Sequence, residues 1–394
     1  MRGFPWRWVL LGVALTLVLL CLTGWAWLCS TGDLDAFAKE AVAAEVSLLP
    51  PPMDPVREAW WQDLGVRTSG APDIVLNYID LQVIERLDSP PFEDVLARAD
   101  MIPAGSVSPP DRELARELRS ICMARLLIEP SSTVPQVLDR IHRFAAAEVG
   151  PDDVWSSWSD TMMWRMVEAV ARRRDNLAAE DRPVIAAKLS ALADLLEQRV
   201  RMHAASLMRN AYALARQGPL ELSTGLQPHL TDLYSVIPSG LACMVVERGG
   251  RAPYLRDLLA WHQAMTKATD ARDMIHIARL DQERWRDPSW QQLLPRQFMG
   301  LYWQQGYFHL RAIGGILHLR LLAADLTGNP WPEDPFADPG TPLHRVERDG
   351  VLLGAWSVGF DGVPQGGDRN RDVCMSLGPP LGKPNMADPL PPAL

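Results

Sequence analysis

The strongest constraint on this chain is a long apolar segment close to its N-terminus. The 22 residues over 8–29, WVLLGVALTLVLLCLTGWAWLC, carry no charged side chain. As an α-helix this segment would be ~33 Å long, which is enough to cross the hydrocarbon core of a bilayer. Arg2 and Arg7 precede it, whereas Asp33 and Asp35 follow it. Because basic residues concentrate on the cytoplasmic side, the sequence predicts a transmembrane helix whose N-terminal flank is cytoplasmic.

A cleaved signal peptide is the alternative interpretation of this segment. The apolar run is longer than the core of an ordinary signal peptide, and no small-x-small cleavage motif follows it directly. The triplet AFA at residues 36–38 is the nearest such motif. We therefore expect residues 1–7 in the cytoplasm, a single-pass anchor over 8–29 in the cytoplasmic (inner) membrane, and a body exported to the periplasm or the cell exterior. Both interpretations export the body.

Charge and cysteine content narrow the class of protein further. The 394 residues carry a net charge of −9, whereas a nucleic-acid footprint needs a basic surface, so we expect no nucleic-acid partner. Cys21 and Cys29 lie in the apolar segment, which leaves Cys122, Cys243 and Cys374 in the exported body. None of these pairs has the spacing of a zinc site, and we expect them to be small buried hydrophobes.

Most of the exported body has the pattern of packed helices. A helix directly after the anchor leads into the proline-rich linker PPPMDP, and together they occupy residues 30–55. The helical domain follows over residues 56–326, and Asp181 with Pro183 signals the start of its longest helix. Apolar residues on that helix recur every three or four positions, as a face turned to a core requires. This stripe consists of Ile185, Leu189, Leu192, Leu196, Val200, His203 and Leu207.

The pattern changes after residue 326. Proline, glycine and aspartate crowd GNPWPEDPFADPGTP, and two strand-like runs then meet at Asp349 and Gly350, a pair typical of tight hairpins. VCMSL is a third short strand, and the proline-rich residues 379–394 are expected to be disordered. The predicted fold is therefore mainly α: a single N-terminal transmembrane helix, a multi-helix exported body and a small C-terminal antiparallel β module over residues 327–378.

One loop of this β module has the pattern of a metal site. Asp368, Asn370 and Asp372 alternate as D-x-N-x-D, and Asp361 stands at the end of the preceding strand. Calcium binds oxygens from carboxylates, amides and backbone carbonyls, all of which this loop offers. Val373 stands where an EF-hand has glycine, and no glutamate closes the loop, so an EF-hand is excluded. A plain turn is the alternative, because turns also favour aspartate and glycine.

The end of the chain also resembles a known module. From Asp334 onward the order is DPF, GTPL, a strand, SVGFDG, a loop rich in glycine and aspartate, and an aspartate before the last strand. This order is similar to the C-terminal module of the major pseudopilins of type II secretion, and to the same module in many membrane-anchored bacterial proteins of unknown role. The resemblance covers residues ~330–377. It implies that the loop binds calcium through Asp361 and Asp372, with Asp368 inside the loop.

The rest of the chain departs from the pseudopilins. Their prepilin-peptidase site, and the glutamate that follows it, are missing from RGFPWRWVLL. Pseudopilins are also much shorter and have no helical body of this size. Assembly into a pilus is therefore not implied by the resemblance.

The sequence lacks the familiar catalytic motifs. It contains no HExxH, no Gly-x-Ser-x-Gly, no Walker loop and no Rossmann fingerprint. His309 and His318 share the local text HLR, but they lie on opposite faces of one helix unless Gly314 and Gly315 interrupt it. We expect His203, on the apolar stripe, to be a core residue.

Two functions are consistent with these features. The first is a non-enzymatic protein of the cell envelope, anchored in the lipid bilayer through residues 8–29, that binds a protein partner and has a calcium loop at its C-terminal end. The alternative is a hydrolase that acts on envelope material, with its site in the helical domain.

Overall fold

A computed structural model gives the fold of this chain. It describes residues 6–48, 130–147, 169–216, 239–285, 296–359, 362–367 and 372–377, with the isolated positions 55, 59, 122, 125, 126, 166 and 167. Within these residues the protein is mainly helical, with a long apolar helix at the N-terminal end and a three-stranded antiparallel sheet near the C-terminal end. These features of the predicted fold are confirmed. The predicted tail over 379–394 and residues 49–54 of the linker lie outside the described part.

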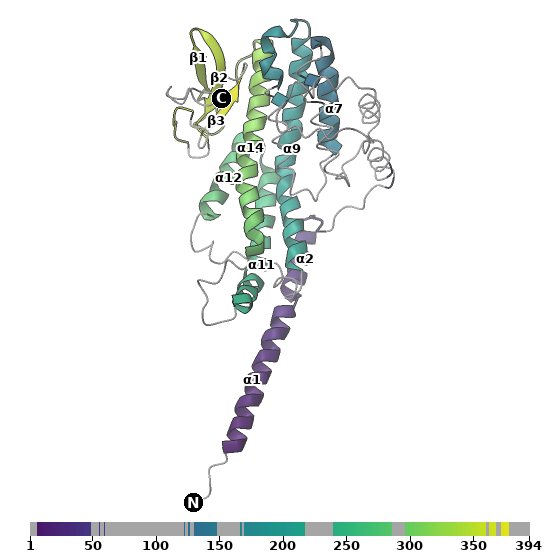
Figure 1. Ribbon diagram of the computed structural model, residues 1–394, viewed down its shortest axis with the longest axis vertical. Coiled ribbons are helices and arrows are strands. Elements are labelled where there is room, and N and C mark those ends of the chain that lie inside the picture. Colours follow the sequence, from purple (N-terminus) through teal and green to yellow (C-terminus); the bar gives the residue numbers. More distant parts are fainter. Residues whose placement is uncertain are drawn as a thin grey trace, which may run out of the picture.

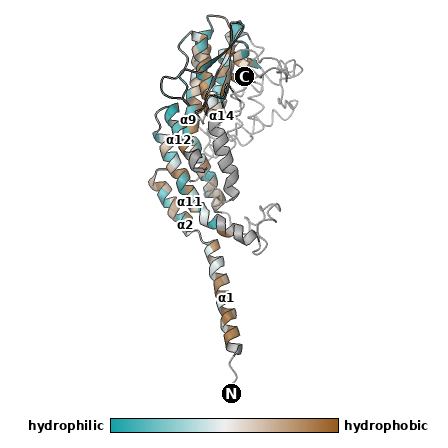
Figure 2. Ribbon diagram, turned by 90° about the vertical axis from the view of Figure 1, so that its left-hand side faces the viewer, coloured by the Kyte–Doolittle hydropathy of each residue, from teal (hydrophilic) through white to brown (hydrophobic). Residues whose placement is uncertain are grey.

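Helix α1, Trp6–Cys29, stands out from the body (Figure 1) and is hydrophobic along almost its whole length (Figure 2). Its apolar side chains are uncovered: Leu10, near one end, is 65% exposed, and Leu22, near the other, is 60% exposed. The predicted apolar helix is confirmed, and it begins at Trp6 rather than Trp8. Its length and composition suit a membrane span.

Helix α2, Gly32–Ala43, follows after only Ser30 and Thr31. It belongs to the body, because side chains at a spacing of three and four residues turn one of its faces into the core. Three of them are fully buried: Leu34, Phe37 and Ala41. The apolar helix therefore enters the body with a break of two residues and no flexible linker.

Two long antiparallel helices form the axis of the body (Figure 1). Helix α9 spans Arg182–Ala215 and helix α14 spans Arg296–Thr327, so each is ~50 Å long. Every member of the stripe predicted on α9 is buried, because this face packs against its neighbours. Three more helices of the described part pack around this pair: α7 (Val134–Ala147), α11 (Ser239–Lys267) and α12 (Ala271–Trp285).

The start of α9 shows how these helices are joined. Pro183 lies in the first turn, as predicted. The Asp181 carboxylate does not cap the helix; instead it accepts a hydrogen bond from Ser131 Oγ at 2.7 Å, just before α7. Farther along, Arg320 of α14 forms an ion pair with Glu197 of α9. Polar contacts between neighbouring helices therefore add to the apolar packing of the stripe on α9.

Three short strands form an antiparallel sheet in the order β1–β2–β3. They span His344–Arg348, Val351–Ser357 and Val373–Ser376. Asp349 and Gly350 both have positive φ, 52° and 76°, which is the backbone of a type I′ turn. The twist of this turn matches that of a two-residue hairpin. The predicted hairpin and third strand are confirmed.

The sheet is packed on both faces and is continuous with the helical body. The cross-strand pair Ala355 and Met375 joins the main core. Trp356 packs in a second cluster, which includes Ile275 of α12 and Ile313 of α14. The strands lie beside the C-terminal half of α14, at the end of the body away from α1 (Figure 1).

A buried histidine joins α14 to this sheet. His318 is fully buried, and its Nε2 donates a hydrogen bond to Ser376 O of β3 at 2.6 Å. Because burial disfavours the charged imidazolium, the pKa of His318 falls from 6.5 to about 4, although the bond to Ser376 opposes this fall. The side chain is therefore neutral at pH 7, and Nε2 carries its proton.

We predict that His318 makes the stability of the fold depend on pH between about 6.5 and 4. Its pKa is lower in the folded state, so its contribution is complete above pH 6.5 and is lost as the pH falls towards 4. The shift corresponds to roughly 3 kcal/mol of unfolding free energy. The variant His318→Gln keeps an N–H donor but has no group that titrates. In detergent, the Tm of this full-length variant should fall less between pH 6.5 and 4 than the Tm of the parent chain.

Burial also lowers the pKa values of His142 and His262, so the variant should keep part of the pH dependence. At pH 7.5 the variant and the parent chain should differ only by a pH-independent packing cost. An identical loss of Tm in both proteins between pH 7.5 and 4 would contradict the role given to His318.

Candidate functional site

One of the four predicted calcium ligands lies in the described part of the structure. Asp372 is 4% exposed and directly precedes β3, and its Oδ2 accepts a hydrogen bond from Gly367 N at 2.6 Å. This bond closes the loop in the way that a turn requires. The other three predicted ligands lie outside the described residues: Asp361, Asp368 and Asn370. The calcium site therefore stays a prediction.

Sequence reasoning gave no role to the acid that organises this module. Asp334 is fully buried, and its Oδ1 accepts hydrogen bonds from Ser357 Oγ at 2.7 Å and from Phe336 N at 2.9 Å. Its Oδ2 accepts a third bond from Val358 N at 3.0 Å. Three donors compensate the carboxylate for its lost water. The signal was the DPF triplet, because an aspartate that binds the N–H two residues on forms an Asx turn.

The histidines singled out from the sequence do not form a pair. Helix α14 continues through its glycine pair, which leaves His309 and His318 on opposite faces; the side chain of His309 lies outside the described part. His203 is buried in the α9 stripe, and its ring meets the edge of Trp261 of α11 with 6.5 Å between ring centroids. It is the core residue that the sequence predicts.

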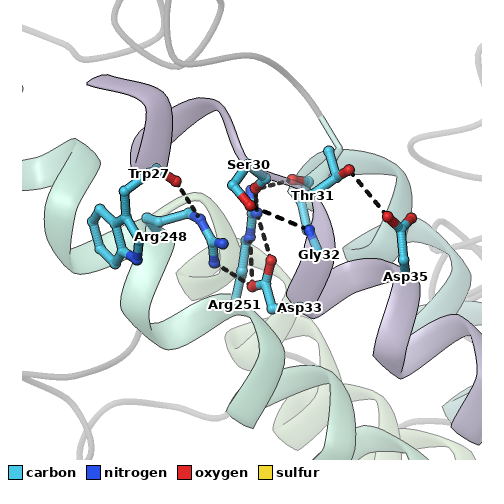
Figure 3. A network of polar contacts seen from close by, with 9 residues as sticks. Trp27, Ser30, Thr31, Gly32, Asp33, Asp35, Arg248 and Arg251 are labelled. Atoms are coloured by element: carbon cyan, nitrogen blue, oxygen red, sulfur yellow. Dashed lines mark hydrogen bonds and ion pairs between the residues drawn. The ribbon is translucent and has the colours of Figure 1, made fainter. Parts of the chain in front are cut away.

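A cluster of charged side chains lies where α1 meets the body (Figure 3). Asp33 stands in the first turn of α2, and Arg248 and Arg251 reach it from α11. The two arginines are three residues apart, so they project from the same side of their helix. Arg251 and Asp33 are 218 residues apart in the sequence. We call these three residues the junction cluster.

Arg251 is the centre of the junction cluster. It is 6% exposed and holds Asp33 with two hydrogen bonds, Nε to Oδ2 at 3.0 Å and Nη2 to Oδ1 at 2.8 Å. Its Nη1 donates to Ala215 O, at the end of α9, at 3.1 Å, and its Nη2 donates to Ser30 O, just after α1. Carbonyls at a helix C-terminus lack partners and carry partial negative charge, so a cation there is favourable. One side chain thus connects α1, α2, α9 and α11.

Arg248 contacts the last turn of α1 itself. Its Nε donates to Trp27 O at 3.2 Å, and its guanidinium lies over the Trp27 ring, 5.2 Å from the centroid. Its Nη1 forms an ion pair with Asp33. Nearby, Arg256 of α11 binds Glu40 of α2 through two nitrogens, each 2.8 Å from a carboxylate oxygen. The same two helices are therefore joined at two successive levels.

The charges of the junction cluster shift the pKa values of its members. Burial alone would raise the pKa of Asp33, but the hydrogen bond and charge of Arg251 and the charge of Arg248 hold that pKa below its ordinary value of 3.8. Burial and the neighbouring Arg251 lower the pKa of Arg248, and Asp33 opposes this. Because these side chains bind one another and the backbone of neighbouring helices, the cluster acts as a structural joint.

The sequence contains only weak signals of this joint. Asp33 indicates topology through its charge, and nothing in the sequence pairs it with a particular basic residue. Two arginines at an RxxR spacing on a helix more often lie on a solvent-exposed face than in a buried ion pair. The joint becomes visible only once α11 is placed against α2.

Comparisons with protein-family models, with curated proteins and with solved structures gave no match to this chain. The resemblance of residues ~330–377 to the pseudopilin module therefore stays a prediction from the sequence.

We predict that Asp33→Ala lowers the stability of the protein and loosens the joint. Removing the acid leaves two arginines beside each other with no carboxylate, and one of them is almost fully buried. The cost should be about 2 kcal/mol, between the values for exposed and fully buried ion pairs. Thermal unfolding of the full chain in detergent should show a fall in Tm of about 3 °C.

Asp35→Ala is the matched control for this variant. Asp35 lies in the same turn of α2 and carries the same charge, but it is exposed. Within the described residues its carboxylate accepts a single hydrogen bond, from Thr31 Oγ1 at 3.3 Å. Its replacement should change the Tm by less than about 1 °C. Equal effects of the two variants would show that the junction cluster does not stabilise the fold.

We also predict that calcium raises the Tm of the full chain, and that Asp368→Asn and Asp372→Ala abolish this increase. Asp372→Ala should in addition lower the Tm without calcium, because the Gly367 N–H loses its acceptor. The informative quantity is therefore the difference in Tm with and without millimolar calcium, measured for each protein. If calcium leaves the Tm of the parent chain unchanged, the loop is a plain turn.

Proposed function

We propose that this protein is a single-pass scaffold of the cell envelope, whose body is held in a fixed orientation at the outer surface of the cytoplasmic membrane. The observation that carries the proposal is the junction cluster, which binds the end of the apolar helix to helices α2, α9 and α11. A protein that needed only attachment to the bilayer would not require this joint, since a flexible linker suffices for attachment.

The uncovered surface of α1 supports membrane attachment. The side chains of residues 9–22 lie open on all sides of the helix, with no part of the body over them. Water-exposed apolar surface of this extent is rare on soluble proteins, and a bilayer would cover it. Arg2 and Arg7 precede the uncharged segment 8–29, and Asp33 and Asp35 follow it, which favours an exported body.

The packing of α2 supports an anchor that is retained. Cleavage after the AFA triplet would separate Leu34 and Phe37 from the rest of α2, and both are fully buried in the core. It would also remove Asp33 from between two arginines. A leader that supplies core residues to the mature fold is a poor candidate for removal.

The end of the body away from α1 carries the C-terminal sheet, beside the C-terminal half of α14 (Figure 1). A body with a long helical axis therefore presents this module away from the membrane surface. We propose that the module is the part that meets a protein partner. Calcium binding by its loop, if present, would stiffen this contact surface.

The topology gives the decisive experiment. We predict that the full chain, tagged at its C-terminus, stays in membranes after alkaline carbonate extraction and keeps the mass of the uncleaved polypeptide. Protease added to intact spheroplasts should digest the body, while a cytoplasmic marker protein stays whole. A mature chain that begins at Lys39, or a body protected from protease until the spheroplasts are lysed, would refute the proposal.

A further inference from the structure

A cleft of about 720 Å³ lies between α12 and the C-terminal sheet. Residues of α12 form one wall, and the loop that holds Asp334 forms the other, with Phe336 and Thr341 in the lining. A volume of this size is typical of pockets that take small molecules or a few residues of a peptide. None of the features described above uses this space.

The α12 wall carries a stripe of basic side chains. Arg272, His276 and Arg279 all line the cleft, and their spacing of four and three residues places them on one face of the helix. Arg272 is committed to the structure: its Nη1 donates to Ala337 O at 2.9 Å and its Nη2 to Asp334 O at 3.3 Å. It fixes the opposite wall of the cleft at a set distance from α12.

Arg279 is the charged group of this wall with capacity left to bind. It is half-buried and donates a single bond within the described structure, from Nη2 to Phe336 O at 3.2 Å. A guanidinium has five N–H donors, and the bond to Phe336 uses one of them. The Nε is buried and closed off from the cleft, so the donors left for a ligand are those of the two Nη atoms. No ion pair within the described residues neutralises its charge.

The other lining groups favour an anionic ligand with an apolar part. His276 is exposed one turn from Arg279, and His344 is stacked on Trp356 with 3.9 Å between ring centroids. Apolar side chains, among them Phe336 and Val358, line the same cleft. The result is a pocket with a cation at one side and an apolar floor.

Two acids also line the cleft, and neither neutralises Arg279. Hydrogen bonds from the Thr269 hydroxyl and backbone N–H hold the Asp273 carboxylate and lower its pKa. Asp338 is exposed at the opposite wall. Arg279 is therefore left as the cation that a ligand would meet.

We infer that this cleft binds a carboxylate, with Arg279 as the residue that holds it. A guanidinium presents its N–H groups in a planar fork that fits the two oxygens of a carboxylate. The apolar floor would receive a hydrophobic group next to the acid. The ligand is a small carboxylic acid or the acidic side chain of a peptide. This inference does not depend on the proposed scaffold function, because the cleft would bind such a ligand in any cellular location.

The test uses the full chain in detergent and titration calorimetry. The probes are 3-phenylpropionate as a free acid and acetyl-Ala-Glu-Phe-amide as a peptide acid, each compared with its neutral analogue, 3-phenylpropionamide or the glutamine peptide. Inorganic phosphate is the third anion. We expect one or both carboxylates to bind. The neutral analogues should bind at least about tenfold more weakly, because hydrogen bonds to charged groups are worth that much. Phosphate should also bind at least about tenfold more weakly, because it has no hydrophobic group for the apolar floor of the cleft. The stronger of the two carboxylates identifies the source of the ligand.

Two variants and a control then locate the site. Arg279→Gln should weaken carboxylate binding at least about tenfold. Arg256→Gln should leave it unchanged, because Arg256 pairs with Glu40 and does not line the cleft. If Arg279→Gln unfolds, Arg279→Lys is tested in its place, because lysine keeps the charge but lacks the planar set of N–H donors. We expect Arg279→Lys to bind the carboxylate about threefold to tenfold more weakly. The inference is overturned if neither acid binds, if the neutral analogues or phosphate bind as well as the acids, or if the variant that folds binds with unchanged affinity.

Discussion

The ion pair between Asp33 and Arg251 couples the apolar helix to everything that follows it. The carboxylate lies one turn beyond the end of α1, and the guanidinium comes from a helix 218 residues later. Arg251 also binds the backbone at the ends of α1 and α9. A charge pair that is partly shielded from water is costly to break, because the partner left behind loses a counter-charge that water replaces only in part. The position of the body relative to the apolar helix follows from this contact.

Two acidic side chains, one near each end of the body, lose contact with water on folding, and different partners compensate each of them. Asp33 meets two full charges and is held by arginines. Asp334 meets neutral donors from a hydroxyl and two backbone N–H groups, and it shapes the loop beside the sheet. Between them the axis of α9 and α14 is held by apolar packing, with charged pairs such as Arg320 and Glu197 near the surface. The helical body and the sheet are therefore one continuous structure.

The features that could be predicted from the sequence are those with a local signal. The uncharged segment, the stripe on α9 and the Asp349–Gly350 turn each depend on residues close together in the chain. The contacts of Asp33 and Asp334 depend on tertiary structure, and the sequence alone does not say which of its 39 basic residues meets a given acid. Asp181 shows the same limit, because its side chain bonds Ser131 instead of capping its own helix. The calcium ligands, apart from Asp372, lie outside the described residues, so that prediction has not been decided.

In the proposed membrane arrangement, the two-residue connection between α1 and α2 has a further consequence for encounters within the bilayer. A domain on a long flexible linker rotates freely, so in most collisions with a neighbour its binding surface faces away. Here the body is bound to the end of α1 through several contacts, so the body can rotate only if α1 rotates in the lipid with it. Two such molecules in one membrane would then meet in a narrow range of relative orientations. They would lose less rotational entropy on association than two bodies on flexible linkers.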